Sequence, residues 1–100
     1  MRIAGIEWDE GNSAKCQKHG VSKEEIESVL LNPRTVGFPD ALHSSMENCF
    51  WTIGRNEEGR CIFLIFTYRS ALEGRCVRPI SARYMHQKEV DYYEKEIPGF

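Results

Sequence analysis

The chain has 100 residues, of which 41% are hydrophobic and 28% are charged. This length supports one hydrophobic core and not two, so we expect a single domain over residues 1–100. The longest apolar run, Cys61–Phe66, is too short to cross a bilayer, and Glu7 interrupts any signal-peptide pattern. We therefore expect a soluble, cytoplasmic protein. A net charge of -2 argues against a broad nonspecific nucleic-acid surface.

The first segment of the chain predicts a short strand followed by a helix. Ile3–Trp8 has the composition of a strand. Asp9 stands where a helix N-cap is expected, and the helix is predicted to run to His19. Gly20 then supplies the usual C-terminal stop.

A second helix is predicted more strongly than the first. Ser22 and Glu25 form a capping-box pattern, and Asn32-Pro33 ends the helical segment. Its apolar stripe consists of Ile26, Val29 and Leu30. Thr35–Phe38 predicts a brief strand, and Pro39–Asn48 predicts a polar loop.

Three longer strands are expected next, at Cys49–Arg55, Cys61–Arg69 and Arg75–Ala82, with turns at Gly59 and Gly74. They predict an antiparallel meander. If residues 56–59 form a tight turn that places Arg55 opposite Arg60, one face carries Trp51, Ile53, Ile62, Leu64, Phe66, Ile80 and Ala82 as the core. The other face then carries Phe50, Thr52, Phe63, Ile65, Thr67, Arg69, Val77, Ser81 and Arg83. A slip of one residue would exchange the two faces.

The C-terminal segment predicts a closing helix over His86–Glu96, with Val90, Tyr93 and Ile97 as its buried stripe and Pro98-Gly99 as its stop. The predicted fold is therefore α+β. Two N-terminal helices and one C-terminal helix are expected to pack on a small antiparallel β-sheet.

The cysteines are expected to be reduced. The same register places Cys61 opposite Gly54 and Cys49 opposite Phe66, so these two thiols do not meet. Cys16 and His19 have the spacing of half a zinc site, but no second pair of ligands follows at a suitable distance. We therefore expect no metal and no cofactor.

Arginines gather in or beside the strands, whereas acidic residues gather in the helices. The arginines are Arg55, Arg60, Arg69, Arg75, Arg78 and Arg83. In the expected register Arg69 faces Arg75. The repulsion between these like charges would be relieved by a bound phosphate or by a carboxylate such as Glu73. Arg83 ends a strand just before a helix N-terminus. Its guanidinium and the backbone N–H groups of that helix can therefore bind the same anion. The alternative is a structural bridge from Arg83 to Glu89.

The histidines and tyrosines are further candidates. His19 could transfer a proton, or it could simply bind the last carbonyls of its helix. His43 and His86 are weaker candidates for proton transfer. Three tyrosines, Tyr84, Tyr92 and Tyr93, could stack on bases or pack against the sheet.

Three short motifs occur in order along the chain: Glu7-Trp8-Asp9, Lys18-His19-Gly20-Val21-Ser22 and the segment from Ile80 to Glu89. With them the chain resembles the BrnT family of small bacterial ribonuclease toxins over nearly its whole length. The resemblance implies a RelE-like fold and metal-independent RNA cleavage that arrests translation and growth. It also implies a small DNA-binding antitoxin, similar to BrnA, whose complex with the toxin represses its own operon and provides the only link to DNA.

The resemblance also implies roles for residues that match its motifs. The residues that match are His19, Arg55, Arg83, Lys88 and Glu89. We expect His19 as the acid or base, and we expect the phosphate clamps to be Arg55, Arg69 and Arg83. The expected RNA-binding residues are Lys18, Arg75 and Lys88, and the supporting residues are Glu89 and Tyr93.

The last helix departs from many relatives, because Val90-Asp91-Tyr92-Tyr93 stands in place of a strongly basic run. Fewer cations imply weaker RNA binding, so a second hypothesis is a catalytically weak binding module that acts mainly through its partner. A third hypothesis is an unrelated metabolic enzyme. The sequence argues against it, because it contains neither a glycine-rich phosphate loop nor paired catalytic acids. An adjacent gene for a DNA-binding protein would favour the first two hypotheses over the third.

Overall fold

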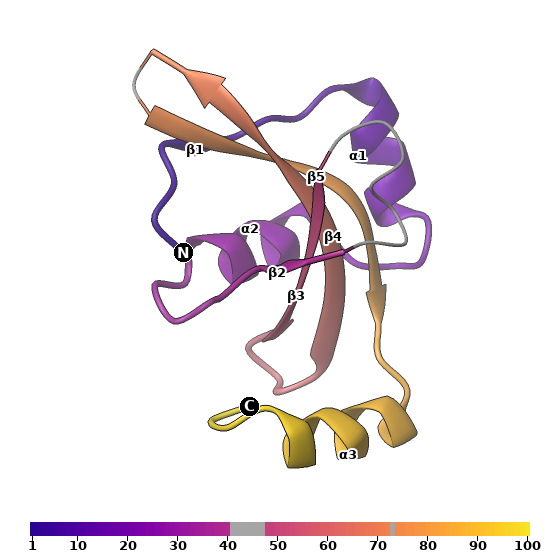
Figure 1. The fold of residues 1–100 in the computed structure, drawn as a ribbon. Helices are drawn as coiled ribbons and strands as arrows, with labels where there is room; N and C mark the ends of the chain where they lie inside the picture. Colours follow the sequence, from indigo (N-terminus) through magenta and orange to yellow (C-terminus); the bar gives the residue numbers. More distant parts are fainter. Residues whose placement is uncertain (41–47, 73) are drawn as a thin grey trace.

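The computed structural model describes residues 1–40, 48–72 and 74–100. In this part of the chain the elements are β1 (Gly5–Ile6), α1 (Glu10–Gln17), α2 (Lys23–Leu31), β2 (Phe38–Pro39), β3 (Cys49–Arg55), β4 (Cys61–Ala71), β5 (Gly74–Tyr84) and α3 (Gln87–Glu96) (Figure 1). The predicted α+β class is confirmed. No helix in the described ranges is long and apolar enough to span a membrane.

The sheet is mixed, so the prediction of a purely antiparallel sheet is wrong. Its strand order is β1-β5-β4-β3-β2. β1 lies parallel to β5, with Gly5 beside Cys76 and Ile6 beside Val77, whereas the other neighbouring strands are antiparallel. A two-residue edge strand joins its neighbour through backbone groups alone, so side-chain pattern does not reveal its partner.

Both N-terminal helices begin at the predicted caps. The Asp9 carboxylate accepts a hydrogen bond from the Asn12 N–H, and the Ser22 hydroxyl accepts one from the Glu25 N–H. These side chains satisfy backbone donors that the first helical turn leaves without partners. α1 is shorter than predicted, and the chain reverses at Gly20, whose φ is 89°.

The turn between β3 and β4 differs from the expected one. Arg55 faces Cys61 and not Arg60. The Asn56 N–H donates to the Arg60 carbonyl at 3.0 Å, and the Asn56 side-chain oxygen accepts from the Arg60 N–H at 2.9 Å. These bonds draw Arg60 into the hairpin and leave a short loop in which Gly59 has a φ of 82°.

This turn moves every partner of β3 by one residue. Trp51 and Ile53 face Ile65 and Phe63, so they lie on the sheet face opposite to the one predicted. Their neighbours Phe50 and Thr52 take the core side instead. On β5, a bulge at Ile80 separates the pair Ile65–Ser81 from the pair Phe66–Pro79. The predicted core positions Trp51, Ile53 and Ile80 were therefore wrong, as was the outward position of Phe50, Thr52 and Val77.

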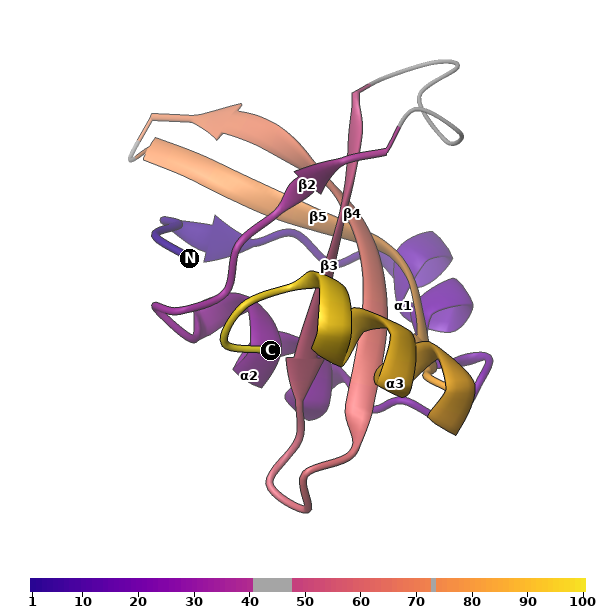
Figure 2. The ribbon, with the colours of Figure 1, turned by 60° about the horizontal axis from the view of Figure 1, so that its bottom comes forward.

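Two apolar clusters lie on the two sides of the sheet. The larger one packs α1 and α2 against it and contains Cys16, Val21, Ile26, Val29, Leu30, Ile62, Leu64, Phe66, Val77 and Ala82. The smaller one lies under α3, which crosses the other face near the start of β4 (Figure 2). It consists of Cys61, Met85 and Val90, with Ile53, Phe63, Tyr93 and Phe100 around them. A small apolar cluster therefore holds α3 on the sheet, and polar contacts add to it.

All four cysteines are thiols, as predicted. Their strand partners differ from the expected ones, since Cys61 faces Arg55 and Cys49 faces Thr67. Cys16 is completely buried, and burial raises the pKa of its thiol to about 11. A thiol with so high a pKa is a poor nucleophile at neutral pH.

Candidate functional site

Arg83 lies within β5, because this strand continues two residues beyond its predicted end. Its backbone pairs with Phe63, and its guanidinium lies 4.9 Å from the centre of the Phe63 ring. Nη1 and Nη2 donate to the two carboxylate oxygens of Glu89 at 2.8 and 2.9 Å. The bridge between Arg83 and Glu89, which was the structural alternative, is therefore present.

Glu89 holds the start of α3 as well as Arg83. Its carboxylate accepts a hydrogen bond from the His86 N–H at 3.0 Å, so it completes the capping box of this helix. The Arg83 guanidinium, together with this bond, lowers the pKa of Glu89 to about 2. Arg83 thus presents a planar fork to a planar anion, which is also the geometry in which arginine binds phosphate.

Arg55 lies on the same sheet face, at the end of β3. Nη1 donates to the Gly59 carbonyl at 3.1 Å, and Nη2 lies 3.4 Å from a carboxylate oxygen of Glu94. The structure therefore brings Arg55 and Arg83 to one face and one end of the sheet. Each of them is paired with a carboxylate of α3.

Arg69 and Arg75 do not face each other, so that prediction is wrong. Arg69 pairs with Cys76, and Arg75 pairs with Ser70, because the β4–β5 ladder continues to Ala71 and Gly74. The Arg75 guanidinium lies 4.0 Å from the centre of the Tyr68 ring. Glu73, the suggested neutralising partner, lies outside the described residues.

Arg69 is also distant from Arg83 along the sheet. It lies six residues along β4 from Phe63, the partner of Arg83. At about 3.3 Å per residue this separation is roughly 20 Å. Arg69 and Arg83 therefore do not share a phosphate.

His19 is exposed in the turn after α1. The carbonyl of the next residue, Gly20, lies 3.5 Å from the Tyr84 hydroxyl, so the turn lies beside the end of β5. None of the described residues forms a hydrogen bond with the His19 ring, so its alternative role as a helix cap is not seen. The Arg60 guanidinium lies 3.7 Å from the centre of the Tyr84 ring.

Tyr84 links three parts of the chain at this end of the sheet. Its hydroxyl donates to the carboxylate of Glu25 in α2, whose oxygens lie 2.8 and 2.9 Å away, and this carboxylate raises the pKa of Tyr84. The Asn56 amide, in the β3–β4 turn, donates to the same carboxylate at 2.9 Å. Sequence reasoning missed that Tyr84 lies beside the turn that carries His19 and that Arg60 packs on the Tyr84 ring, because no local pattern indicates contacts that depend on the hairpin register.

The remaining predicted residues have diverse surroundings. Lys18 and Lys88 are exposed, next to His19 and Glu89 respectively. Tyr93 packs 5.6 Å from Trp51, centre to centre, so it supports α3. His43 lies outside the described residues. We call Lys18, His19, Arg55, Arg60, Arg83 and Lys88 the basic end of the sheet.

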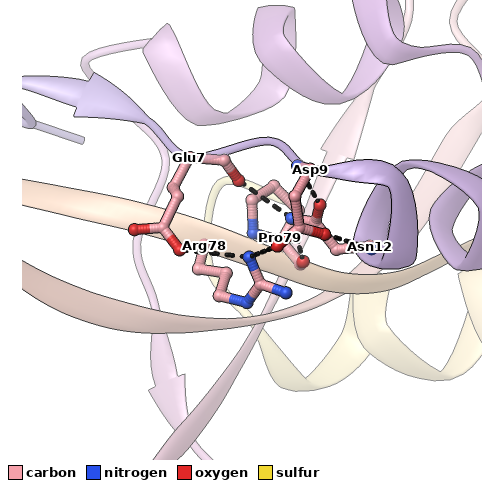
Figure 3. Close-up of polar contacts among 5 residues, drawn as sticks. All are labelled: Glu7, Asp9, Asn12, Arg78 and Pro79. Carbon is pink, nitrogen blue, oxygen red and sulfur yellow. Dashed lines mark hydrogen bonds and ion pairs between the residues drawn. The ribbon is translucent and has the colours of Figure 1, made fainter.

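The two acidic residues of the motif Glu7-Trp8-Asp9 have an architectural role, and Figure 3 shows their contacts. Arg78 donates to the carboxylates of Glu7 and Asp9 at 3.1 and 2.7 Å. The Asn12 amide is buried and donates to the carbonyls of Glu7 and Pro79 at 2.8 and 3.0 Å. This network joins the start of α1 to β5. It holds the sheet to the helices rather than forming part of the basic end.

The described part of the chain contains no group of three or more histidine, cysteine or acidic side chains that could hold a metal ion. The side chains that its geometry brings together instead are cationic. Arg83 and Arg55 lie on the α3 face at one end of the sheet. The exposed His19 lies in a turn at the same end, beside Tyr84, whose side chain is on the opposite face. Two guanidinium groups on one sheet face are typical of a site for a phosphate-containing anion.

Comparison with protein families identifies the chain. Residues 8–89 match the model of a family described as ribonuclease toxin, BrnT, of type II toxin-antitoxin system. The match covers most of the sequence, so the chain belongs to the BrnT family, and the resemblance carried by its motifs is confirmed. A search of curated proteins found no match.

Proposed function

We propose that this protein cleaves RNA at the basic end of its sheet, without a metal ion, and thereby arrests translation and growth. Membership of a ribonuclease toxin family supports cleavage of RNA. The observation that carries the proposed site is the bidentate contact of Arg83 with a carboxylate, on the sheet face that also carries Arg55. A phosphate has the charge and geometry to replace that carboxylate.

Cleavage of RNA by its own 2′-OH needs three contributions. One group removes the hydroxyl proton, another protonates the leaving oxygen, and cations stabilise the charged phosphorane. In this proposal Arg55 and Arg83 bind the phosphate that is cleaved. His19, exposed beside Tyr84, carries one of the two proton transfers.

The other predicted residues take supporting roles in this proposal. Lys18 and Lys88 are exposed at the basic end and bind neighbouring phosphates. Arg69 and Arg75, at the far end of the β4–β5 hairpin, contact phosphates elsewhere along the RNA. Glu89 orients Arg83, while Tyr93 supports α3 through its packing on Trp51, Tyr92 and Phe100.

One observation favours a second candidate function. Both proposed phosphate clamps are already occupied, Arg83 by Glu89 and Arg55 by Glu94. RNA has to displace these carboxylates, which lowers its affinity relative to an open cationic site. A catalytically weak protein that acts mainly through its partner would have this arrangement.

A type II toxin-antitoxin family implies an antitoxin partner. We propose that this partner is a small BrnA-like protein that binds DNA and covers the basic end, and that the complex represses its own operon. We further propose a RelE-like arrangement of the fold and a cytoplasmic location, where the RNA substrate is found. Contact with DNA is then made through the antitoxin alone.

The direct test incubates purified protein with RNA of mixed sequence in excess EDTA. Metal-independent cleavage by the 2′-OH yields fragments that end in a 2′,3′-cyclic phosphate. An Arg83→Ala preparation, purified in parallel, controls for contaminating nucleases. Cleavage that stops in EDTA and returns with magnesium contradicts the proposed mechanism. A wild-type protein that binds its antitoxin but cleaves no RNA favours the second candidate.

A further inference from the structure

A groove of about 640 Å³ lies beside Arg55, outside the contacts already described. It runs between the segment that follows α2, the second half of β3 and the last residues of the chain. The side chains that matter most here are Arg34, Val36, Phe38, Ile53, Arg55 and Phe100. Its volume is within the range of sites that bind small molecules or single nucleotides.

The walls of this groove are mostly apolar, and local contacts hold them in place. Val36 is 59% exposed, a high value for a valine. Its carbonyl accepts a hydrogen bond from the buried hydroxyl of Thr52 at 2.7 Å, which fixes this segment to β3. Phe38 stacks on Trp51 with ring centres 4.6 Å apart. The groove is therefore formed by the fold and does not need a ligand to create its walls.

The charged side chains that line the groove are basic, although one of them, Arg55, also contacts Glu94 of α3. Arg34 and Arg55 are the charged side chains that line it. Arg34 is exposed, and no carboxylate in the described ranges pairs with it. Arg55 also lies 5.1 Å from the centre of the Phe100 ring. Apolar and aromatic walls beside two guanidinium groups match a base with its attached phosphate, since single-stranded RNA is bound through stacking and cations.

We infer that this groove binds one nucleotide of single-stranded RNA next to the cleaved bond. The base lies against Val36, Phe38 and Phe100, and its phosphate lies between Arg34 and Arg55. The inference rests on the proposed function, because Arg55 is one of the proposed phosphate clamps. It adds a subsite that governs how RNA is selected and positioned.

The test uses a short RNA of mixed sequence with 2′-O-methyl groups, which the protein can bind but not cleave. Affinity is measured over a range of salt concentrations for wild type and Arg34→Ala. We expect Arg34→Ala to bind several-fold more weakly and to reduce the slope of log affinity against log salt by about 0.7, the value for one lost phosphate contact. Arg2→Ala removes an exposed arginine outside the groove and is the matched control.

Val36→Asp provides a second variant, because an exposed position tolerates a polar side chain and the new carboxylate repels phosphate. It should weaken RNA binding more than Arg34→Ala while the melting temperature stays near that of wild type. Binding by both variants that equals binding by Arg2→Ala overturns the inference. Normal RNA binding by these variants together with loss of antitoxin binding also overturns the inference, because it would assign the groove to the antitoxin.

Failure of this subsite and failure of the proposed function give different results. If wild type cleaves RNA in EDTA but the Arg34 and Val36 variants bind as it does, the subsite is wrong and the function stands. If these variants lose RNA binding while wild type never cleaves, the subsite stands and the proposed cleavage is wrong. Wild-type protein that does not bind the uncleavable RNA at low salt also overturns the subsite.

Discussion

Arg83 either binds the cleaved phosphate or serves only as a structural bridge to Glu89, and substitutions at these two residues distinguish the two roles. If it binds the cleaved phosphate, Arg83→Ala should lower the cleavage rate by about 10²-fold, as loss of one oxyanion donor does in other enzymes. Arg83→Lys should recover only part of the rate, because lysine keeps the charge but lacks the fork. The rates are measured per folded molecule on preparations with known melting temperatures.

Glu89→Gln is the matched control for Arg83→Ala. It weakens the same bridge but leaves the arginine in place, so it should lower cleavage far less than Arg83→Ala does. Both variants should lose about 1 kcal/mol or less of stability, since the Arg83 and Glu89 side chains are 40% and 30% exposed. Equal melting temperatures and wild-type cleavage in both variants would remove Arg83 from the site.

The bridge also predicts a dependence of stability on pH. The pKa of Glu89 falls from 4.5 to about 2 in the folded protein, chiefly through its hydrogen bond with Arg83. Because the unfolded chain binds the proton more tightly, the stabilisation is complete above pH 4.5 and is lost as the pH falls toward about 2. The difference in melting temperature between wild type and Glu89→Gln should therefore shrink over this range. A difference that stays constant to about pH 3 would show that Glu89 does not stabilise the fold through its charge.

At the level of elements, the contact between α2 and β3 depends on a glycine. A Cβ at Gly54 would lie 2.6 and 2.7 Å from the two methyl groups of Val29 in α2. Gly54→Ala should therefore lower the free energy of unfolding by about 1–3 kcal/mol, the usual cost of overpacking. Denaturant titration measures this directly.

Gly5→Ala is the control, because a Cβ there would lie 3.7 Å from the Cys76 sulfur, an ordinary contact. The cost of Gly54→Ala should also fall in a Val29→Ala background, where the methyl groups are gone. If Gly54→Ala costs no more than Gly5→Ala, α2 does not pack on β3 as closely as the structure shows.

α3 is the element that connects the fold to the proposed function. It covers one sheet face through a small apolar cluster, and its carboxylates occupy Arg55 and Arg83. The aromatic residues beneath it are packed, since Trp51 lies 4.6 Å from Phe38 and 5.7 Å from Phe63, centre to centre. Trp51 is therefore a support for α3, although tryptophan is a frequent interface residue.

For the whole molecule, we expect a tight complex with the product of a neighbouring gene. An antitoxin that covers the basic end should block cleavage and should co-elute with this protein in gel filtration after co-expression. A one-to-one mixture should protect RNA that the free protein cleaves. Two separately eluting proteins at micromolar concentration would show that the pairing is wrong.

Much of the fold follows from local sequence. The N-cap at Asp9 and the capping box at Ser22 predicted the starts of α1 and α2, because a side chain bonds to backbone N–H groups only a few residues away. The bounds predicted for β3 match the structure, and the motifs predicted the family. Both depend on residues that are close in the chain.

Only the tertiary structure decided which side chains meet. Three residues between Asn56 and Arg60 set the hairpin register, and that register placed Trp51 and Ile53 under α3. The β4–β5 pairing placed Arg69 and Arg75 opposite other residues, and the fold brought Tyr84, with Arg60 on its ring, beside the turn that carries His19. Local hydrogen bonds are encoded by neighbouring residues, whereas strand register is determined by turn geometry and by packing between distant segments. For this reason the sequence determined the class, the family and the candidate residues, and the three-dimensional packing determined which of them share a site.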